Sequence, residues 1–166
     1  SPYGIINPKR VEGFPGKMMY GGCYVFKYDP KTKSLEAIIT DMDRPNGVAL
    51  SRDETHLIIS NTGDLKYLRR YEINKSLKIS NPIEFARQDP EHVFDGFRFD
   101  ADDNLWTSCG DGVACYATSG EQIGYIKMPE RVSNVEFGGK EGNTLFITAS
   151  SSLYMTSLSV KGAKFK

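Results

Sequence analysis

Short runs of β-branched and aromatic residues alternate with clusters of Gly, Asp, Asn and Pro along the whole chain. No stretch of a dozen residues carries apolar positions at helical spacing, so helices are not predicted. The runs have the length and composition of strands bounded by turns. The pattern predicts an all-β chain with strands at residues 23–28, 35–39, 47–50, 57–60, 67–72, 96–99, 105–108, 113–117, 122–127, 135–137, 145–148 and 152–158.

The segments between these runs have the chemistry of tight turns. Residues 29–32, 102–104 and 138–143 are rich in Asp, Asn and Gly, which cap turns with their side chains or adopt positive φ. Neighbouring strands are therefore expected to pair antiparallel.

An internal repeat appears when the segments that start at residues 44, 93 and 131 are laid over one another, since each reads as strand, polar turn and strand. The apolar pairs that align are Val48 and Leu50, Phe97 and Phe99, and Val135 and Phe137, at spacings of 49 and 38 residues. Periods of about 40 to 50 residues are typical of β-propeller blades. A five-strand sandwich or barrel is the alternative, because all-β patterning does not choose between these architectures.

A six-bladed propeller needs roughly 270 residues, so the 166 residues of this chain supply about three blades. We expect a single domain over residues 1–166, with a lid-like loop at 1–22 and the blades at 23–166. The start at Ser1, without a methionine, predicts a processed, truncated or cleaved N-terminus. An open half-ring would expose strand edges, so the expected partner is the missing N-terminal half or a second copy.

Composition excludes several classes of function. Lys plus Arg and Asp plus Glu are each 21, so no positive field gathers nucleic acid. The longest apolar runs are far shorter than a membrane span, and no membrane partner is expected. The three cysteines have no CxxC spacing, which predicts buried, reduced thiols and favours the cytoplasm over the periplasm or secretion, although neither of those is excluded.

Polar residues stand at one position of the repeat, two residues before the first apolar anchor. These residues are Asn46, Asp95 and Ser133, and Asn134 follows one position later. In a propeller this position rings the mouth of the central channel, where amide and carboxylate oxygens could hold Ca²⁺ or Mg²⁺. The alternative is that Asn46-Gly47 and Asp95-Gly96 are simply hairpin-turn dipeptides.

Four segments in order along the chain resemble signatures of the SMP-30/gluconolactonase family, which includes luciferin-regenerating-enzyme-like proteins. Residues 44–54 are similar to its "PNG" strand, and residues 95–106 to its "DG" strand that ends in an apolar residue and Trp. Residues 137–149 resemble its last-blade signature, and Tyr3-Gly4-Ile5 with Glu12-Gly13 and Gly21-Gly22 resembles a loop of its earlier half. The similarity looks closest to the bacterial gluconolactonases.

The resemblance implies metal-dependent hydrolysis of sugar lactones. Carried over, Asn46 and Asp95 are ligands of one divalent metal, with Ca²⁺ expected first and Zn²⁺ or Mg²⁺ as alternatives, and Asp95 is the catalytic general base. The candidates for contact with the lactone are Tyr3, Met19 and Tyr20 of the loop and Asn134 at the rim. The alternative is that the loop is a passive crossover. The family's glutamate ligand and its substrate-gripping Arg and Asn have no counterpart here, so the chain by itself is expected to bind metal weakly and to be a poor lactonase. A non-catalytic half-propeller that self-associates is the alternative.

Overall fold

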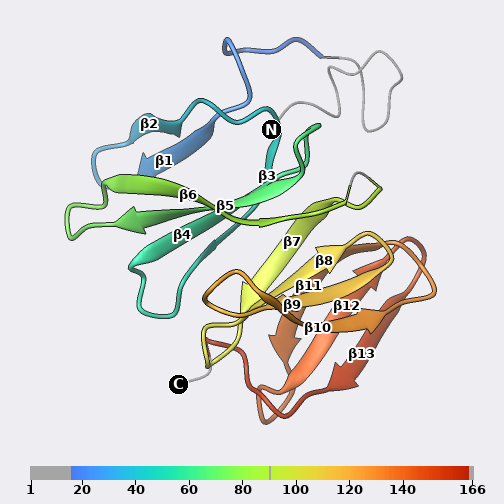
Figure 1. Cartoon of the computed structure of the whole chain (residues 1–166). Coiled ribbons are helices and arrows are strands. Elements are labelled where there is room, and N and C mark those ends of the chain that lie inside the picture. The colour runs from blue at the N-terminus through green and yellow to red at the C-terminus, as the bar shows by residue number, and fades with distance from the viewer. Residues whose placement is uncertain (1–15, 90, 165–166) are drawn as a thin grey trace.

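A computed structural model of the chain describes residues 16–89 and 91–164. Within these ranges the protein is all-β, without a helix (Figure 1). The strands are β1 (Val25–Asp29), β2 (Ser34–Ile39), β3 (Pro45–Leu50), β4 (His56–Asn61), β5 (Tyr67–Ile73), β6 (Ile79–Arg87), β7 (Phe94–Phe99), β8 (Leu105–Cys109), β9 (Gly112–Tyr116), β10 (Gln122–Lys127), β11 (Val132–Gly138), β12 (Thr144–Ala149) and β13 (Leu153–Ser157).

The strands form four antiparallel meander sheets. The hairpin β1-β2 comes first, two four-stranded sheets follow (β3-β4-β5-β6 and β7-β8-β9-β10), and a three-stranded sheet (β11-β12-β13) ends the chain. Every strand pair is antiparallel and consecutive in sequence, which confirms the prediction from the turns.

Strand β6 was missed by the sequence pattern. Its residues include Asn81 and Pro82, which read as a loop because proline cannot donate a ladder hydrogen bond. The structure places β6 at the outer edge of its sheet, where one side of the strand has no partner strand in the sheet and proline is tolerated. The register of β6 against β5 also shifts between Arg70 and Glu72, as expected for an irregular edge.

Three apolar clusters fill the spaces between successive sheets. The first joins β1-β2 to the next sheet through Ile39, Ile59 and Tyr71, and the second joins the two four-stranded sheets through Ile58, Phe97 and other residues. The third lies between β7-β10 and β11-β13, where Trp106 meets Phe137 edge to face at 6.2 Å between ring centroids. The core is therefore a series of sheet-on-sheet layers.

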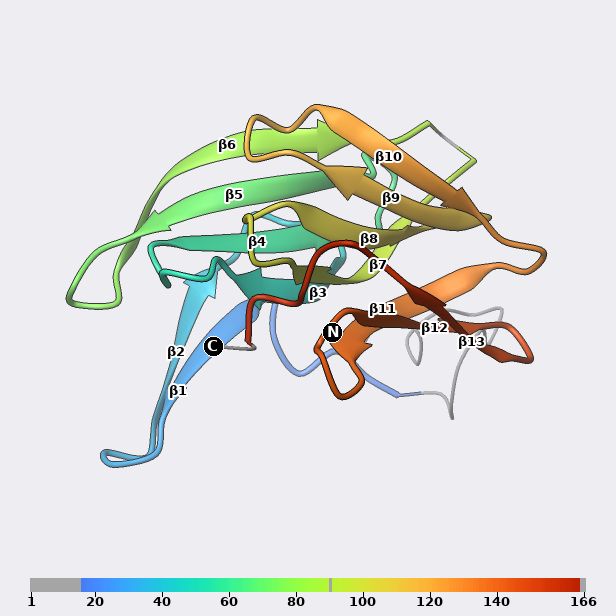
Figure 2. The same ribbon diagram turned by 90° about the horizontal axis from the view of Figure 1, so that it is seen from below.

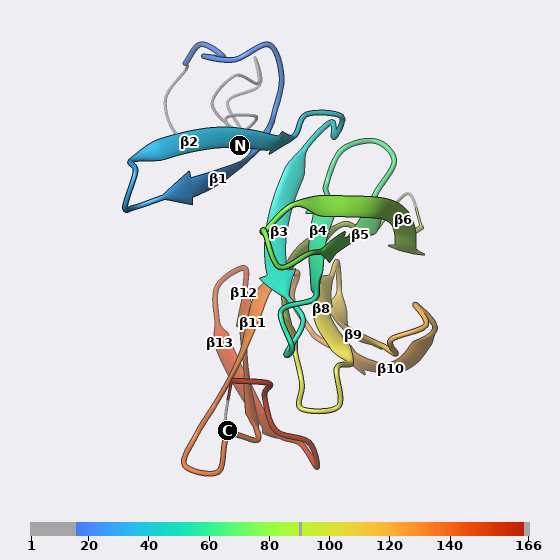
Figure 3. The same ribbon diagram turned by 90° about the vertical axis from the view of Figure 1, so that its left-hand side faces the viewer.

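The first strands of the three larger sheets lie next to one another. β3 contacts β7, and β7 contacts β11, while the later strands of each sheet extend outward. Figures 2 and 3 show the resulting fan, with β1-β2 at one side and β11-β13 at the other. This arrangement puts the same end of β3, β7 and β11, the end at which each strand begins, on one face of the fan.

The three cysteines are free and buried, as predicted. Burial raises the pKa of the Cys109 thiol to about 11 and that of the Cys115 thiol to about 12, so both are protonated at neutral pH. None of the described residues forms a helix long and apolar enough to cross a membrane.

Candidate functional site

The strands β3, β7 and β11, which begin the three larger sheets and lie side by side, are the inner strands. The candidate residues lie where the pairing of these strands is interrupted. In β3, Asn46 and Gly47 together face Ser60 of β4, because the register shifts between Pro45 and Val48. In β7, Asp95 and Gly96 face Ser108 of β8 in the same way. A β-bulge of this kind places two residues opposite one and redirects the side chains of the bulged strand.

The alternative that these dipeptides are hairpin turns is wrong. Asn46-Gly47 and Asp95-Gly96 lie inside β3 and β7, and neither glycine takes positive φ. The third sheet repeats the arrangement at Ser133 and Asn134, which face Thr148 of β12 across another register shift. Three bulges therefore stand at the same height on three adjacent inner strands.

Glycine at the second bulge position allows the inner strands to approach closely. A Cβ on Gly47 would lie 2.0 Å from the carbonyl oxygen of Asp95, so only glycine fits between β3 and β7. A Cβ on Gly96 would lie 2.0 Å from Oδ1 of Asn134, whose side chain covers Gly96. The structure thus brings the Asn46-Gly47, Asp95-Gly96 and Asn134 segments together at one end of the fan.

A hydroxyl group lies opposite each bulge and satisfies its backbone. Ser60 Oγ accepts a hydrogen bond from Gly47 N at 2.7 Å and donates to the Asp95 carbonyl at 3.2 Å. Ser108 Oγ accepts from Asp95 N at 3.2 Å and donates to the Gly96 carbonyl at 3.1 Å. Both serines are 0% exposed, so their hydroxyl groups are shielded from solvent.

The hydroxyl residues were not singled out from the sequence. The sequence does contain a shared feature, because a hydroxyl residue stands near the end of the second strand in each repeat. These residues are Ser60, Ser108 and Thr148. That pattern does not predict their role, since a serine or threonine in a strand does not by itself indicate that the neighbouring strand has a bulge.

The donor set suits a hard cation in part. Asn46 and Asp95, both half-buried, offer an amide oxygen and a carboxylate from adjacent strands. Such oxygens are the usual ligands of Ca²⁺, which takes six to eight of them. Among the described residues no group of three or more His, Cys, Asp and Glu side chains is placed to hold a metal. Asn46 and Asp95 therefore fit as part of a metal site, and further oxygens have to complete it.

The remaining candidates for substrate contact have different outcomes. The Asn134 side chain lies over Gly96, the residue after Asp95, and its Oδ1 accepts a hydrogen bond from Val135 N at 2.8 Å. The side chain of Met19 is 86% exposed, and Tyr20 packs its ring against Tyr24 and Phe26. Tyr3 lies outside the described residues. Met19 and Tyr20 thus belong to a segment around β1, and their contact with substrate stays a prediction.

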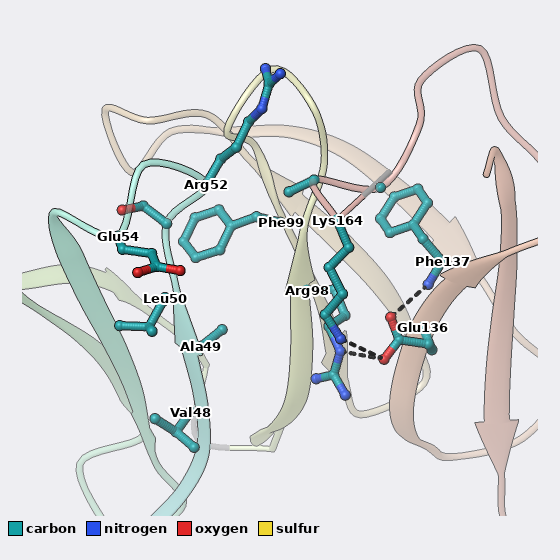
Figure 4. Close-up of a pocket in the computed structure, with 13 residues that line it drawn as sticks. Val48, Ala49, Leu50, Arg52, Glu54, Arg98, Phe99, Glu136, Phe137 and Lys164 are labelled. Atoms are coloured by element: carbon teal, nitrogen blue, oxygen red, sulfur yellow. Dashed lines mark hydrogen bonds and ion pairs between the residues drawn. The ribbon is translucent and has the colours of Figure 1, made fainter. Parts of the chain in front are cut away.

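A cleft of about 600 Å³ lies at the opposite ends of the same strands (Figure 4). Its lining combines apolar side chains from the ends of β3, β7 and β11, such as Leu50, Phe99 and Phe137, with charged side chains such as Arg52 and Glu54. Arg98 Nε and Glu136 Oε2 form an ion pair at 2.6 Å on the side of the cleft away from β3, and Lys164 approaches Glu136 at 3.9 Å (Figure 4). This cleft contains none of the candidate site residues.

The model of the SMP-30/gluconolactonase/LRE-like region matches residues 9–151. A gluconolactonase from Zymomonas mobilis is 35% identical over an alignment of 159 positions that covers 90% of this chain and 43% of that protein.

Two solved structures are similar over nearly the whole chain. A provisionally named gluconolactonase has a TM-score of 0.84 and 34% identity, covering 96% of this chain and 53% of that one. A gluconolactonase from Xanthomonas campestris has a TM-score of 0.82 and 28% identity, covering 97% and 51%. The chain therefore spans about half the length of these relatives.

A more distant structure shows the fold alone. The β-propeller domain of Cps50 (Swd1) from Myceliophthora thermophila has a TM-score of 0.58 at 12% identity, covering 80% of this chain and 46% of that one. The fan of meander sheets is thus the arrangement found in β-propellers, as the repeat predicted.

Proposed function

This chain belongs to the SMP-30/gluconolactonase/LRE-like family, and from that premise we propose that it contributes part of the active site of a metal-dependent sugar-lactone hydrolase. The observation that carries the proposal is the pair of bulges that brings Asn46 and Asp95 to the same end of two adjacent inner strands. These are the two residues that the family signatures assign to the metal.

Each residue has a role that its chemistry supports. The Asn46 amide oxygen and the Asp95 carboxylate would hold one divalent cation, with Ca²⁺ favoured by this all-oxygen pair over Zn²⁺. The bound cation would supply the positive charge that polarises the lactone carbonyl. Asp95 would accept a proton from the attacking water as general base.

The reaction adds one water molecule across the ester of the ring. The water oxygen forms a bond to the carbonyl carbon, and the bond from that carbon to the ring oxygen breaks. The proton taken by Asp95 is then available to the departing ring oxygen, which leaves as a hydroxyl group of the open-chain hydroxy acid. Asn134, whose side chain lies over Gly96, would contact the substrate.

The architecture we propose is a six-bladed propeller of which this chain forms about three blades. Two sheets have four strands, whereas β11-β12-β13 has three, and the exposed fractions of Leu153 and Met155 on its edge strand are 68% and 72%. A fourth strand added to β13 would make this sheet match the others. The hairpin β1-β2 would be the outer half of another blade.

The strand count favours the rest of the ring over a second copy as partner. Counting the strands of the described residues, two copies that met end to end would put β11-β12-β13 of one and β1-β2 of the other into a blade of five strands, one more than the four-stranded sheets have. The alternative of a self-associating, non-catalytic module is thus less well supported. Native mass spectrometry of the particle and of each polypeptide in it would separate the two arrangements.

The catalytic proposal is tested by hydrolysis of gluconolactone with and without Ca²⁺, in the particle that mass spectrometry identifies. We expect chelation to abolish activity and Asp95→Asn to lower kcat by about a thousandfold, the middle of the range for a lost general base. Glu136→Gln, in the cleft at the opposite end, is the matched control and should leave kcat unchanged. Activity that survives both chelation and Asp95→Asn would refute the proposal.

A further inference from the structure

Three inner strands repeat one structural device that the proposed chemistry does not explain. At each bulge the residue opposite is Ser60, Ser108 or Thr148, so a hydroxyl group always stands where one residue faces two. Thr148 Oγ1 lies 2.9 Å from Ser133 Oγ and donates to the Asn134 carbonyl at 3.4 Å. Repetition in three sheets indicates a common role.

The hydroxyl replaces ladder hydrogen bonds that a bulge disrupts. Two residues opposite one leave backbone N–H and C=O groups without a partner across the pair. Ser108 compensates for this within its own sheet, since it bonds both Asp95 N and the Gly96 carbonyl. Buried backbone groups left unpaired would otherwise favour a regular strand with a different register.

Ser60 does more, because it connects two sheets. Its hydroxyl accepts from Gly47 N in β3 and donates to the carbonyl of Asp95 in β7. The backbone next to Asn46 and the backbone of Asp95 are thus tied to one buried oxygen. A single side chain therefore sets the separation between the strands that carry the two candidate ligands.

We propose that Ser60 and Ser108 are positioning residues, whose hydroxyls fix the bulges and so hold the Asn46 and Asp95 side chains in the geometry that binds a divalent cation. This inference rests on the proposed function for its consequence, but the hydrogen bonds themselves can be tested without metal. A one-residue shift of β7 would turn Asp95 to the other face of the sheet, and the hydroxyls oppose that shift.

The test measures amide hydrogen exchange of the metal-free chain by NMR and Ca²⁺ binding by calorimetry. We expect Ser60→Ala to speed exchange at Gly47, and Ser108→Ala at Asp95, about tenfold, the value of one net hydrogen bond. Each should also weaken Ca²⁺ binding by about tenfold. Ser60→Thr and Ser108→Thr should restore both readouts, because threonine has this role at Thr148.

The matched control is Thr107→Val. Thr107 is also 0% exposed on β8, but its hydroxyl donates to the Ser108 carbonyl at 3.1 Å rather than to an inner strand. We expect this variant to lose stability without a change in exchange at Asp95 or in Ca²⁺ affinity. If an alanine variant fails to fold, Ser→Cys at the same position fills the space with a weaker acceptor and should give the same changes.

The outcomes separate this inference from the proposed function. Unchanged exchange at Gly47 and Asp95 in the serine variants would overturn the positioning role. Faster exchange with unchanged Ca²⁺ affinity would also overturn it, because the hydroxyls would then hold the backbone without placing the ligands. If the wild-type particle bound no Ca²⁺, the proposed function would fail, and the exchange data alone would decide whether the hydroxyls fix the bulges.

Discussion

The two ends of the inner strands are built in different ways. Where β3, β7 and β11 begin, bulges, glycines and buried hydroxyls bring the backbones together, and the candidate ligands lie there. Where the same strands end, they border a cleft of mixed apolar and charged lining with a partly exposed ion pair, and residues 161–163 pair with residues 99–101. Bulges with buried hydroxyls opposite them thus lie at the end that carries the candidate ligands, whereas a cleft and a backbone bridge from residues 161–163 lie at the other end.

The largest effect on stability is expected at Asp100, which directly follows β7 at the end where the inner strands stop. This carboxylate is 0% exposed and accepts hydrogen bonds from Asp102 N, Asn104 N and Nδ2, and Trp106 Nε1. Asp100→Ala would leave these donors without their acceptor and should cost about 4 kcal/mol. Chemical denaturation would measure the loss, with exposed Asp102→Ala as control, and an unchanged Ca²⁺ affinity per folded molecule is expected. A loss below about 1 kcal/mol would contradict this role.

A smaller effect, but one that should reach the candidate site, is expected at Gly47. In Gly47→Ala the new methyl would meet the Asp95 carbonyl, which belongs to backbone and cannot rotate away, so we expect a cost of about 3 kcal/mol and weaker Ca²⁺ binding. In Gly96→Ala the methyl would meet the end of the Asn134 side chain, which can turn, at a cost of about 1 kcal/mol. Equal losses in the two variants would show that backbone contact is not what limits the site.

The dependence of stability on acid pH should reflect Glu130, which lies just before β11 at the end where the inner strands begin. Glu130 accepts hydrogen bonds from Ser152, Tyr154 and Ser151, and these lower the pKa of its carboxyl to about 2. A folded-state pKa below the ordinary 4.5 gives stability that is present above pH 4.5 and is lost as the pH falls toward 2. Glu130→Gln should flatten the stability profile in that window, measured by denaturation at several pH values. An unchanged profile would mean that these hydrogen bonds do not favour the ionised carboxylate.

The smallest effect is expected for the ion pair in the cleft. Arg98 and Glu136 keep side-chain exposures of 31% and 44%, so solvent screens their attraction. Glu136→Gln should cost no more than about 1 kcal/mol, and the difference from wild type should shrink in high salt. A larger loss of stability that does not depend on salt would contradict this. The ion pair would then support the strands as strongly as the hydrogen bonds where the inner strands begin.

The sequence by itself determined the all-β class, the antiparallel meander and the repeat, because strand periodicity and turn chemistry are local properties. It also put forward Asn46 and Asp95 as candidate ligands, since their position in the repeat and in the family signatures is visible without a fold. It missed β6, whose proline is acceptable only because the strand lies at a sheet edge.

Only the tertiary structure decided how the two candidate ligands are held. Asn46-Gly47 and Asp95-Gly96 read equally well as turns, and it is the pairing of β3 with β4 and of β7 with β8 that makes them bulges. The importance of Ser60 and Gly47 depends on β7 lying against β3, a contact between residues 35 or more positions apart. Such contacts are set by how the sheets pack together, which no local pattern of residues encodes.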